Sequence, residues 1–218
     1  MTDKFEEKRE RMVNRDIKRR GIADQNVIDS MLSVPRHEFV PEDIKGSAYI
    51  DRPLSIGHEQ TISQPYIVAL MVEGAHLKPG DKVLEIGAGS GYAAAVTSNI
   101  ASEVYTVESI PALAHRAEET LHNLGYSNVH VNCSDGSKGW AEHAPYDAII
   151  VTAAAPSIPH SLKEQVKEGG RIVIPVASGV FGEKLVCATK AAGGEFREEQ
   201  LGAVCFVPLV GEEGYAAD

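Results

Sequence analysis

The first third of the chain carries apolar residues at helical spacing, separated by a segment rich in proline and glycine. Residues 4–20 are polar apart from a narrow apolar stripe and end at Gly21, which predicts a surface helix. The same spacing recurs over 24–33 and over 64–77. Residues 35–60 show no period, so we expect irregular structure there. The pattern therefore predicts a helical cap at the beginning of the chain.

Beyond residue 77, short apolar runs alternate with helical patterns. We expect strands at 82–86, 104–107, 129–132, 148–152 and 171–176, with helices at 92–101, 111–124 and 161–167. This alternation predicts right-handed βαβ units and a parallel sheet. Two further β-like runs, 184–189 and 201–207, are expected to form an antiparallel edge.

The predicted fold class is therefore α/β, with a doubly wound, mostly parallel seven-stranded sheet. We expect residues 1–77 to form the N-terminal helical cap and substrate-side segment, packed on an α/β core over 78–218. No linker or repeat separates the two parts, so one structural domain is expected overall.

Composition and charge narrow the range of partners. The 218 residues include 43% hydrophobic and 24% charged residues, as in ordinary globular proteins. The net charge of −10 argues against a protein that binds nucleic acid through its phosphate backbone. No run of about 18 apolar residues exists, so no membrane span is expected. The charged first twenty residues lack the apolar core of a signal peptide, which favours the cytoplasm.

The cysteines and histidines give no sign of a disulfide framework or a metal site. Three cysteines cannot all pair, and Cys187 and Cys205 lie in apolar runs, where we expect them to be buried. The eight histidines include no HExxH motif and no pair at metal-ligand spacing. No metal is therefore expected, and a reducing compartment fits best.

A glycine-rich loop follows the first core strand and opens a helix, reading EIGAGSG over 85–91. Glycines there permit unusual φ angles and let a ligand approach the backbone. Glu108 ends the next strand, where a carboxylate can accept hydrogen bonds from both hydroxyls of a ribose. The alternative is a tight turn and a solvated glutamate. The candidate cofactor-binding residues of the loop are Glu85, Gly87, Ala88, Gly89 and Ser90.

Glu85 favours a cationic ligand over a dinucleotide. A carboxylate two residues before Gly87 suits an ammonium and a sulfonium better than a pyrophosphate, although a lysine or backbone amide could also be its partner. This arrangement resembles motif I of S-adenosylmethionine-dependent methyltransferases. Asp135 and Gly136 follow the third strand at the same sheet edge, where Asp135 either accepts from an adenine amine or only forms a turn. Thr152 ends the fourth strand, and no Asn/Asp-Pro-Pro-aromatic element follows it, which argues against N-methylation of bases.

Several blocks together resemble the protein-L-isoaspartate(D-aspartate) O-methyltransferase family over about residues 11–210. They are PRHEFVP at 35–41, AYIDRPL at 48–54, QTISQP at 60–65, the motif at 83–92 and the pair at 135–136. The TISQP block is the most specific, although a Ser/Thr-rich segment before proline can also simply cap a helix.

The resemblance implies a fold, a cofactor and roles for individual residues. The fold would be Rossmann-like, S-adenosyl-L-methionine the methyl donor and S-adenosyl-L-homocysteine the product. Ser63 matches the active-site serine, Thr61 and Ile62 line the cofactor and substrate face, and Glu108 matches the ribose-binding acid. The adenine-side pair is Asp135 and Gly136, and Thr152 belongs to the matching fourth-strand block. Residues 206–209 match a strand that closes the site, and Glu59 and Val210 depart from the family pattern.

The implied reaction methylates the α-carboxylate of L-isoaspartyl and D-aspartyl residues in damaged peptides and proteins, which is a repair function. A carboxylate is ionised at pH 7, so no general base is needed, and we expect Ser63 to orient it. Three alternatives stay open, namely a small-molecule O-methyltransferase of the same fold, a nicotinamide-dependent oxidoreductase and a non-catalytic module. A monomer without nucleic-acid or membrane partners is expected.

Overall fold

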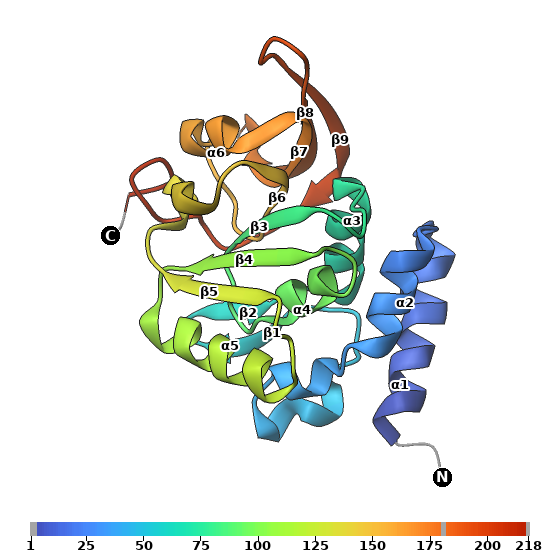
Figure 1. Ribbon diagram of the computed structural model, residues 1–218. Coiled ribbons are helices and arrows are strands. Elements are labelled where there is room, and N and C mark those ends of the chain that lie inside the picture. The colour runs from blue at the N-terminus through green and yellow to red at the C-terminus, as the bar shows by residue number, and fades with distance from the viewer. Residues whose placement is uncertain (1–3, 180–181, 217–218) are drawn as a thin grey trace.

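A central sheet with helices on both faces forms the body of the protein (Figure 1). The computed structural model describes residues 4–179 and 182–216. The seven strands of the sheet are β3 (Lys82–Ile86), β4 (Glu103–Glu108), β5 (Val129–Cys133), β6 (Tyr146–Val151), β7 (Val166–Ala177), β8 (Glu183–Lys190) and β9 (Phe196–Val204). Their order in the sheet is β5-β4-β3-β6-β7-β8-β9.

Strands β3 to β7 run parallel, and β8 and β9 add two antiparallel pairings at one edge. The predicted doubly wound, mostly parallel sheet is confirmed. The chain moves outward from β3 to β4 and β5 and then crosses to β6 on the other side of β3. This reversal opens a crevice at the carboxyl ends of β3 and β6, where ligands bind in such sheets.

The helices begin and end at residues that suit helix termini. They are α1 (Lys4–Met12), α2 (Gln25–Ser33), α3 (Pro65–Ala75), α4 (Tyr92–Ser98), α5 (Pro111–Asn123) and α6 (His160–Gln165). Asp24 caps α2 by accepting from the amides of Asn26 and Val27, and α3 and α5 each begin with a proline. After α1 the chain continues through a π turn and a 3-10 turn to Gly21, whose φ of 103° ends the helical run.

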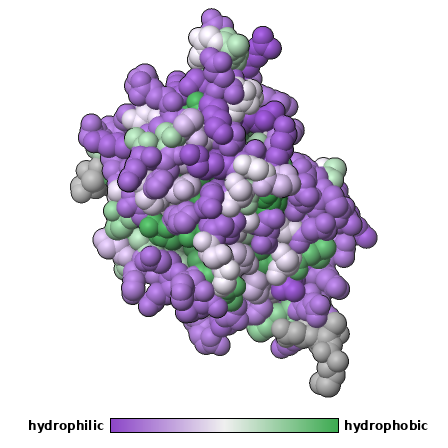
Figure 2. Space-filling model, in the orientation of Figure 1, coloured by the Kyte–Doolittle hydropathy of each residue, from purple (hydrophilic) through white to green (hydrophobic). Residues whose placement is uncertain are grey.

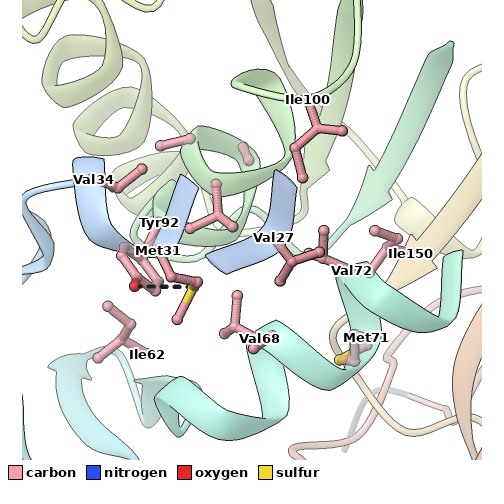
Figure 3. Packing of buried hydrophobic residues seen from close by; sticks show 14 of the residues in the cluster. Val27, Met31, Val34, Ile62, Val68, Met71, Val72, Tyr92, Ile100 and Ile150 are labelled. Atoms are coloured by element: carbon pink, nitrogen blue, oxygen red, sulfur yellow. Dashed lines mark hydrogen bonds between the residues drawn. The ribbon is translucent and has the colours of Figure 1, made fainter. Parts of the chain in front are cut away.

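Two layers of apolar side chains hold the sheet between its helices. Alternate residues of each strand point to opposite faces, so Val83 belongs to one layer and Leu84 to the other. The first layer joins α1 to α5 to the sheet, and the second contains Leu162 of α6. Figure 3 shows the first layer, where the Tyr92 hydroxyl meets the Met31 sulfur at 3.6 Å. The cap and the sheet therefore share one core.

The segment at 35–60 is more regular than its sequence pattern indicates. Short 3-10 helices occupy Arg36–Phe39 and Glu42–Ser47, and β1 (Leu54–Gly57) pairs with β2 (Gln60–Ile62) as a hairpin. Its turn residues His58 and Glu59 have φ angles of 54° and 59°. Asparagine and glycine are the usual residues there, so the hairpin carries no recognisable turn signal.

The last strand also differs from the prediction. The sequence pattern predicts this strand at 201–207, but β9 begins at Phe196 and ends at Val204. β9 is the edge strand, and its first half is polar and exposed. That half therefore contains no apolar run from which a strand could be predicted. Residues 205–207 leave the sheet instead of extending it.

The surface in Figure 2 is mostly hydrophilic, with apolar areas interspersed. Four large apolar residues of the described chain are exposed, namely Ile50, Leu124, Val210 and Tyr215. Across residues 4–179 and 182–216, none of the helices has the length and apolar character that a bilayer crossing needs. Within those same ranges, His, Cys, Asp and Glu side chains form no group of three that could hold a metal ion.

We predict that Met31→Ala destabilises the whole molecule. Met31 is fully buried in the layer shared by cap and sheet, so its truncation should lower the free energy of unfolding by about 2–5 kcal/mol. Ile50→Ala, at a cap residue that is 47% exposed, is the control and should change it by less than about 0.5 kcal/mol.

Urea unfolding followed by circular dichroism and by fluorescence of Trp140, the single tryptophan, measures this effect. The two transitions should coincide and shift together. A Met31→Ala protein whose circular dichroism transition shifts while the Trp140 transition stays in place would show that the cap unfolds separately.

Candidate active site

A cavity of about 300 Å³ lies where the carboxyl ends of β3, β4 and β6 meet the residues around β2. Its walls contain most of the residues that the sequence singles out. Ten of those twelve line it, namely Thr61, Ile62, Ser63, Gly87, Ala88, Gly89, Ser90, Glu108, Gly136 and Thr152. The sequence blocks thus converge on one site from distant parts of the chain.

The glycine loop is held by the tips of two neighbouring strands. The Gly87 amide donates to the Val107 carbonyl at 2.8 Å, and the Thr152 hydroxyl donates to the Gly87 carbonyl at 2.7 Å. Gly87 has a φ of 94°, and a Cβ there would lie 2.5 Å from the Thr152 hydroxyl oxygen. A side chain at this position would therefore displace the threonine that fixes the loop.

Glu108 is oriented by backbone amides and faces the cavity. One carboxylate oxygen accepts from the Gly89 amide at 2.8 Å, and the other accepts from the Ile110 amide at 3.0 Å. Each oxygen keeps a further lone pair. The carboxylate can therefore accept hydroxyl groups from a ligand without reorganising, as the ribose-binding role requires.

Glu85 lies behind the cavity wall rather than in it. The residue is 1% exposed, and one oxygen accepts from the Thr106 hydroxyl at 2.5 Å while the other has no hydrogen-bond partner. Burial raises the pKa of Glu85 to about 8, against the opposing hydrogen bond from Thr106, and the nearby charge of Glu108 raises it further. A positively charged ligand group would favour the ionised carboxylate and so offset both the burial of Glu85 and its repulsion by Glu108. The sulfonium and ammonium of S-adenosylmethionine are such groups.

Asp135 does not line the cavity. One of its oxygens accepts from the amide and the hydroxyl of Ser137, and the other accepts from the Glu212 amide at 2.9 Å. Its carboxylate thus fastens the C-terminal segment that follows Val210. Its neighbour Gly136 does line the cavity, and a Cβ there would lie 2.7 Å from a methyl group of Ile86.

Ser63 lies at the junction of the cavity and a second hollow. The adjoining groove, of about 620 Å³, is lined by Ser63, Thr61, Thr152 and Val207 among others. Ser63 is not the cap of α3, because Gln64 holds that position and makes no side-chain bond to the helix amides. The serine therefore stands between the cofactor-sized cavity and a groove from which a second molecule can approach.

The cavity is also lined by residues that the sequence analysis does not single out. Ser109 and Ile110 follow Glu108 directly, so their place after the second strand could have indicated them. Val68 on α3 and Ala93 on α4 also line the cavity, but they look like ordinary apolar helix positions. Of the two departures from the family pattern, Val210 lines the cavity.

The structure also gives the position of Glu59 and the burial of Cys187 and Cys205. Glu59 lies in the exposed hairpin turn and lines neither the cavity nor the groove. Cys187 is buried as predicted, but the prediction that Cys205 is buried is wrong. Cys205 follows the end of β9 and lines the groove, because the chain leaves the sheet there.

We predict a pH-dependent stability that comes from Glu85. Its folded pKa lies above the value of about 4.3 for a free glutamate, so folding favours the protonated form. The contribution of protonated Glu85 to the free energy of unfolding is fully present below about pH 4 and is lost as the pH rises towards about 8. Glu85→Gln mimics the protonated form, so the variant should gain stability relative to the wild type between about pH 5 and pH 8.

Urea unfolding of the ligand-free proteins at the two pH values measures the difference. Glu10→Gln on α1 is the matched control, because Glu10 is exposed and takes part in no ion pair among the described residues, so the variant should give the same difference at both pH values. An equal pH response of wild type and Glu85→Gln would contradict the prediction.

Comparisons with known proteins agree with the geometry. The family model described as protein-L-isoaspartate(D-aspartate) O-methyltransferase matches residues 7–214. The chain is 53% identical to a Rhodopseudomonas palustris protein-L-isoaspartate O-methyltransferase 1, covering 98% of this chain and 87% of that protein. It is also 53% identical to the enzyme named protein-L-isoaspartate O-methyltransferase in Pelotomaculum thermopropionicum, over 95% of this chain and 90% of that protein.

Solved structures give the same result. A structure titled protein-L-isoaspartate O-methyltransferase matches with a TM-score of 0.86 at 30% identity, covering 94% of this chain and 67% of that chain. A Plasmodium falciparum structure described under the same enzyme name, in complex with S-adenosyl-L-homocysteine, matches with a TM-score of 0.80 at 27% identity, over 96% of this chain and 99% of that chain. The chain belongs to the protein-L-isoaspartate(D-aspartate) O-methyltransferase family.

Proposed function

We propose that this chain methylates the α-carboxylate of L-isoaspartyl and D-aspartyl residues in damaged proteins and peptides, with Ser63 at the reacting end of its site. Its family membership makes it an S-adenosylmethionine-dependent O-methyltransferase. The observation that carries the proposal for the site is the position of Ser63, which lines both the cavity and the adjoining groove.

The cavity side holds the methyl donor. When bound, S-adenosylmethionine supplies a methyl group on a sulfonium, whose departing thioether carries no charge. Glu108 accepts from the ribose hydroxyls, and the loop from Gly87 to Ser90 contacts the ligand through its backbone. Glu85 lies behind the loop with one carboxyl oxygen free of hydrogen bonds, and a bound cation would favour its ionised form. Gly136 and Ile110 contribute further parts of the cavity wall.

The groove side receives the substrate carboxylate. The Ser63 hydroxyl donates a hydrogen bond to one carboxylate oxygen and so orients the other towards the methyl group. Ser63 takes no proton and forms no covalent bond, since the carboxylate is already ionised at neutral pH. Thr61, Thr152 and Val207 enclose the junction and exclude water from it.

We assign the two sides of the site to the two predicted parts of the chain. The cap, 1–77, supplies the substrate side with Ser63, and the core, 78–218, supplies the cofactor side. Residues 1–3, 180–181 and 217–218 of these ranges lie outside the described residues. We also propose that the enzyme acts as a cytoplasmic monomer without nucleic-acid or membrane partners, which the net charge of −10 and a cavity lined by this one chain support.

A methyl-transfer assay with paired peptides tests the activity. A peptide with one L-isoaspartyl residue should become methylated in the presence of S-adenosylmethionine, while its L-aspartyl twin should not. Methylation of neither peptide, together with turnover of a small carboxylic acid or alcohol, would favour a small-molecule O-methyltransferase. Thermal stabilisation by S-adenosylhomocysteine and not by a nicotinamide dinucleotide checks the cofactor class.

We predict that Ser63→Ala lowers kcat/KM for the isoaspartyl peptide by about 10- to 100-fold, which corresponds to one hydrogen bond to a charged group. Affinity for S-adenosylhomocysteine should change little, because the carboxylate and not the cofactor loses a partner. Ser33→Ala is the control, since that hydroxyl donates to the Ser30 carbonyl and accepts from the Asn99 side chain but lines neither the cavity nor the groove. Unchanged kcat/KM in folded Ser63→Ala would remove the proposed role.

A further inference from the structure

Arg36 is a charged residue that the proposed chemistry does not use, yet it is buried beside the site. It opens the 3-10 helix Arg36–Phe39 in the cap and is 0% exposed. Its Nε donates to the Ala48 carbonyl at 2.7 Å, and its Nη2 donates to the Ser63 carbonyl at 2.8 Å. The guanidinium lies over the Tyr92 ring, with Cζ 4.6 Å from the ring centre.

The charge of Arg36 has no close counter-ion. None of the ion pairs among residues 4–179 and 182–216 includes it, and its Nη1 is buried without a hydrogen-bond partner. Asp51 acts on it only at longer range and forms its own ion pair with Arg20 at 2.8 Å. Burial lowers the pKa of Arg36, although neighbouring groups act against this. An unpaired buried charge destabilises a fold, so the presence of Arg36 indicates that it contributes to function instead.

The contacts of Arg36 join the two halves of the proposed site. Ser63 belongs to the cap side, whereas Tyr92 is the first residue of α4, directly after the glycine loop. Asp51 holds the residues that follow Ser63, since its carboxylate accepts from the Gln64 side chain at 2.7 Å and from the Tyr66 amide at 3.0 Å. Arg36 thus holds the Ser63 carbonyl, and Asp51 holds Gln64 and Tyr66, which follow it in the chain.

We propose that Arg36 is a positioning residue for methyl transfer, which fixes the Ser63 backbone against the start of α4 and sets a positive charge behind the point where the substrate carboxylate binds. This inference rests on the proposed function. A fixed serine has less freedom to lose when it orients the carboxylate. A buried positive charge attracts that carboxylate more strongly than an exposed one does, because water screens it less.

Two substitutions separate the charge from the fork of hydrogen bonds. Arg36→Met removes both, and Arg36→Lys keeps the charge but lacks the planar fork that reaches two carbonyls. We expect Arg36→Met to lower kcat about tenfold and to raise the KM for the isoaspartyl peptide about tenfold. Arg36→Lys should keep the lowered kcat but restore most of the peptide KM.

Lys190→Met is the matched control. The Lys190 ammonium also joins two backbone carbonyls, those of Lys163 and Val166, at 2.8 Å and 2.9 Å, but it lines neither the cavity nor the groove. Its substitution should lower the unfolding temperature and leave kcat and KM unchanged. All variants are checked by circular dichroism and by S-adenosylhomocysteine binding, which should stay within about threefold of the wild type because the cofactor side is intact.

A double-substitution cycle distinguishes positioning from mere support of the fold. In a Ser63→Ala background, Arg36→Lys should lower kcat much less than it does in the wild type, since the group that it positions is gone. Equal fold-losses in both backgrounds, or a folded Arg36→Met with wild-type kcat and peptide KM, would overturn the inference. If Arg36→Met does not fold, the Arg36→Lys cycle decides alone. Failure of the wild type to methylate the peptide would instead overturn the proposed function, and this inference with it.

Discussion

The site depends on the hydrogen bonds that fasten the glycine loop to its neighbouring strands. The amides of Gly87 and Gly89 donate to the tip of β4, and Thr152 at the end of β6 donates back to the Gly87 carbonyl. Only a residue without a side chain leaves room for that threonine. The loop backbone is therefore bound on two sides before any ligand arrives, and the direction of Glu108 follows from the same bonds.

The two charges of the reaction meet opposite charges in the protein. In the proposed arrangement Glu108 faces the cationic methyl donor and Glu85 lies behind the same wall of the core, whereas Arg36 belongs to the cap and lies behind Ser63 on the side of the anionic substrate. Under this proposal, the separation accounts for how a chain of net charge −10 accepts a carboxylate. Long-range repulsion from the surface is screened by salt, while a buried charge acts at short range in a medium of lower dielectric constant.

Sequence alone predicts the parts of the fold whose cause is local. The strands β3 and β6 contain apolar runs, and the loop at Gly87 and the acid at Glu108 follow from spacing along one chain. The β1–β2 hairpin was missed because His58 and Glu59 adopt left-handed angles that other residues usually occupy. Asp135 carries the right residue type at the right strand end, but one of its oxygens accepts from Glu212 in the C-terminal segment, a partner that no local pattern reveals.

The burial of Arg36 in the cap is likewise a result of long-range contacts that a local sequence pattern does not predict. Its motif is visible in the sequence, but its burial depends on Ala48, Ser63 and Tyr92, which come from three separate segments. A further bond ties the cap to the core, since the Ser30 hydroxyl donates to the Val96 carbonyl. Within the cap, Glu73 on α3 accepts from the amides of Ala23 and Asp24. Because the cap and the sheet also share one apolar layer, folding itself sets the position of Ser63 relative to the glycine loop. The alignment that methyl transfer requires is then built before the substrate enters, and binding energy need not be spent on creating it.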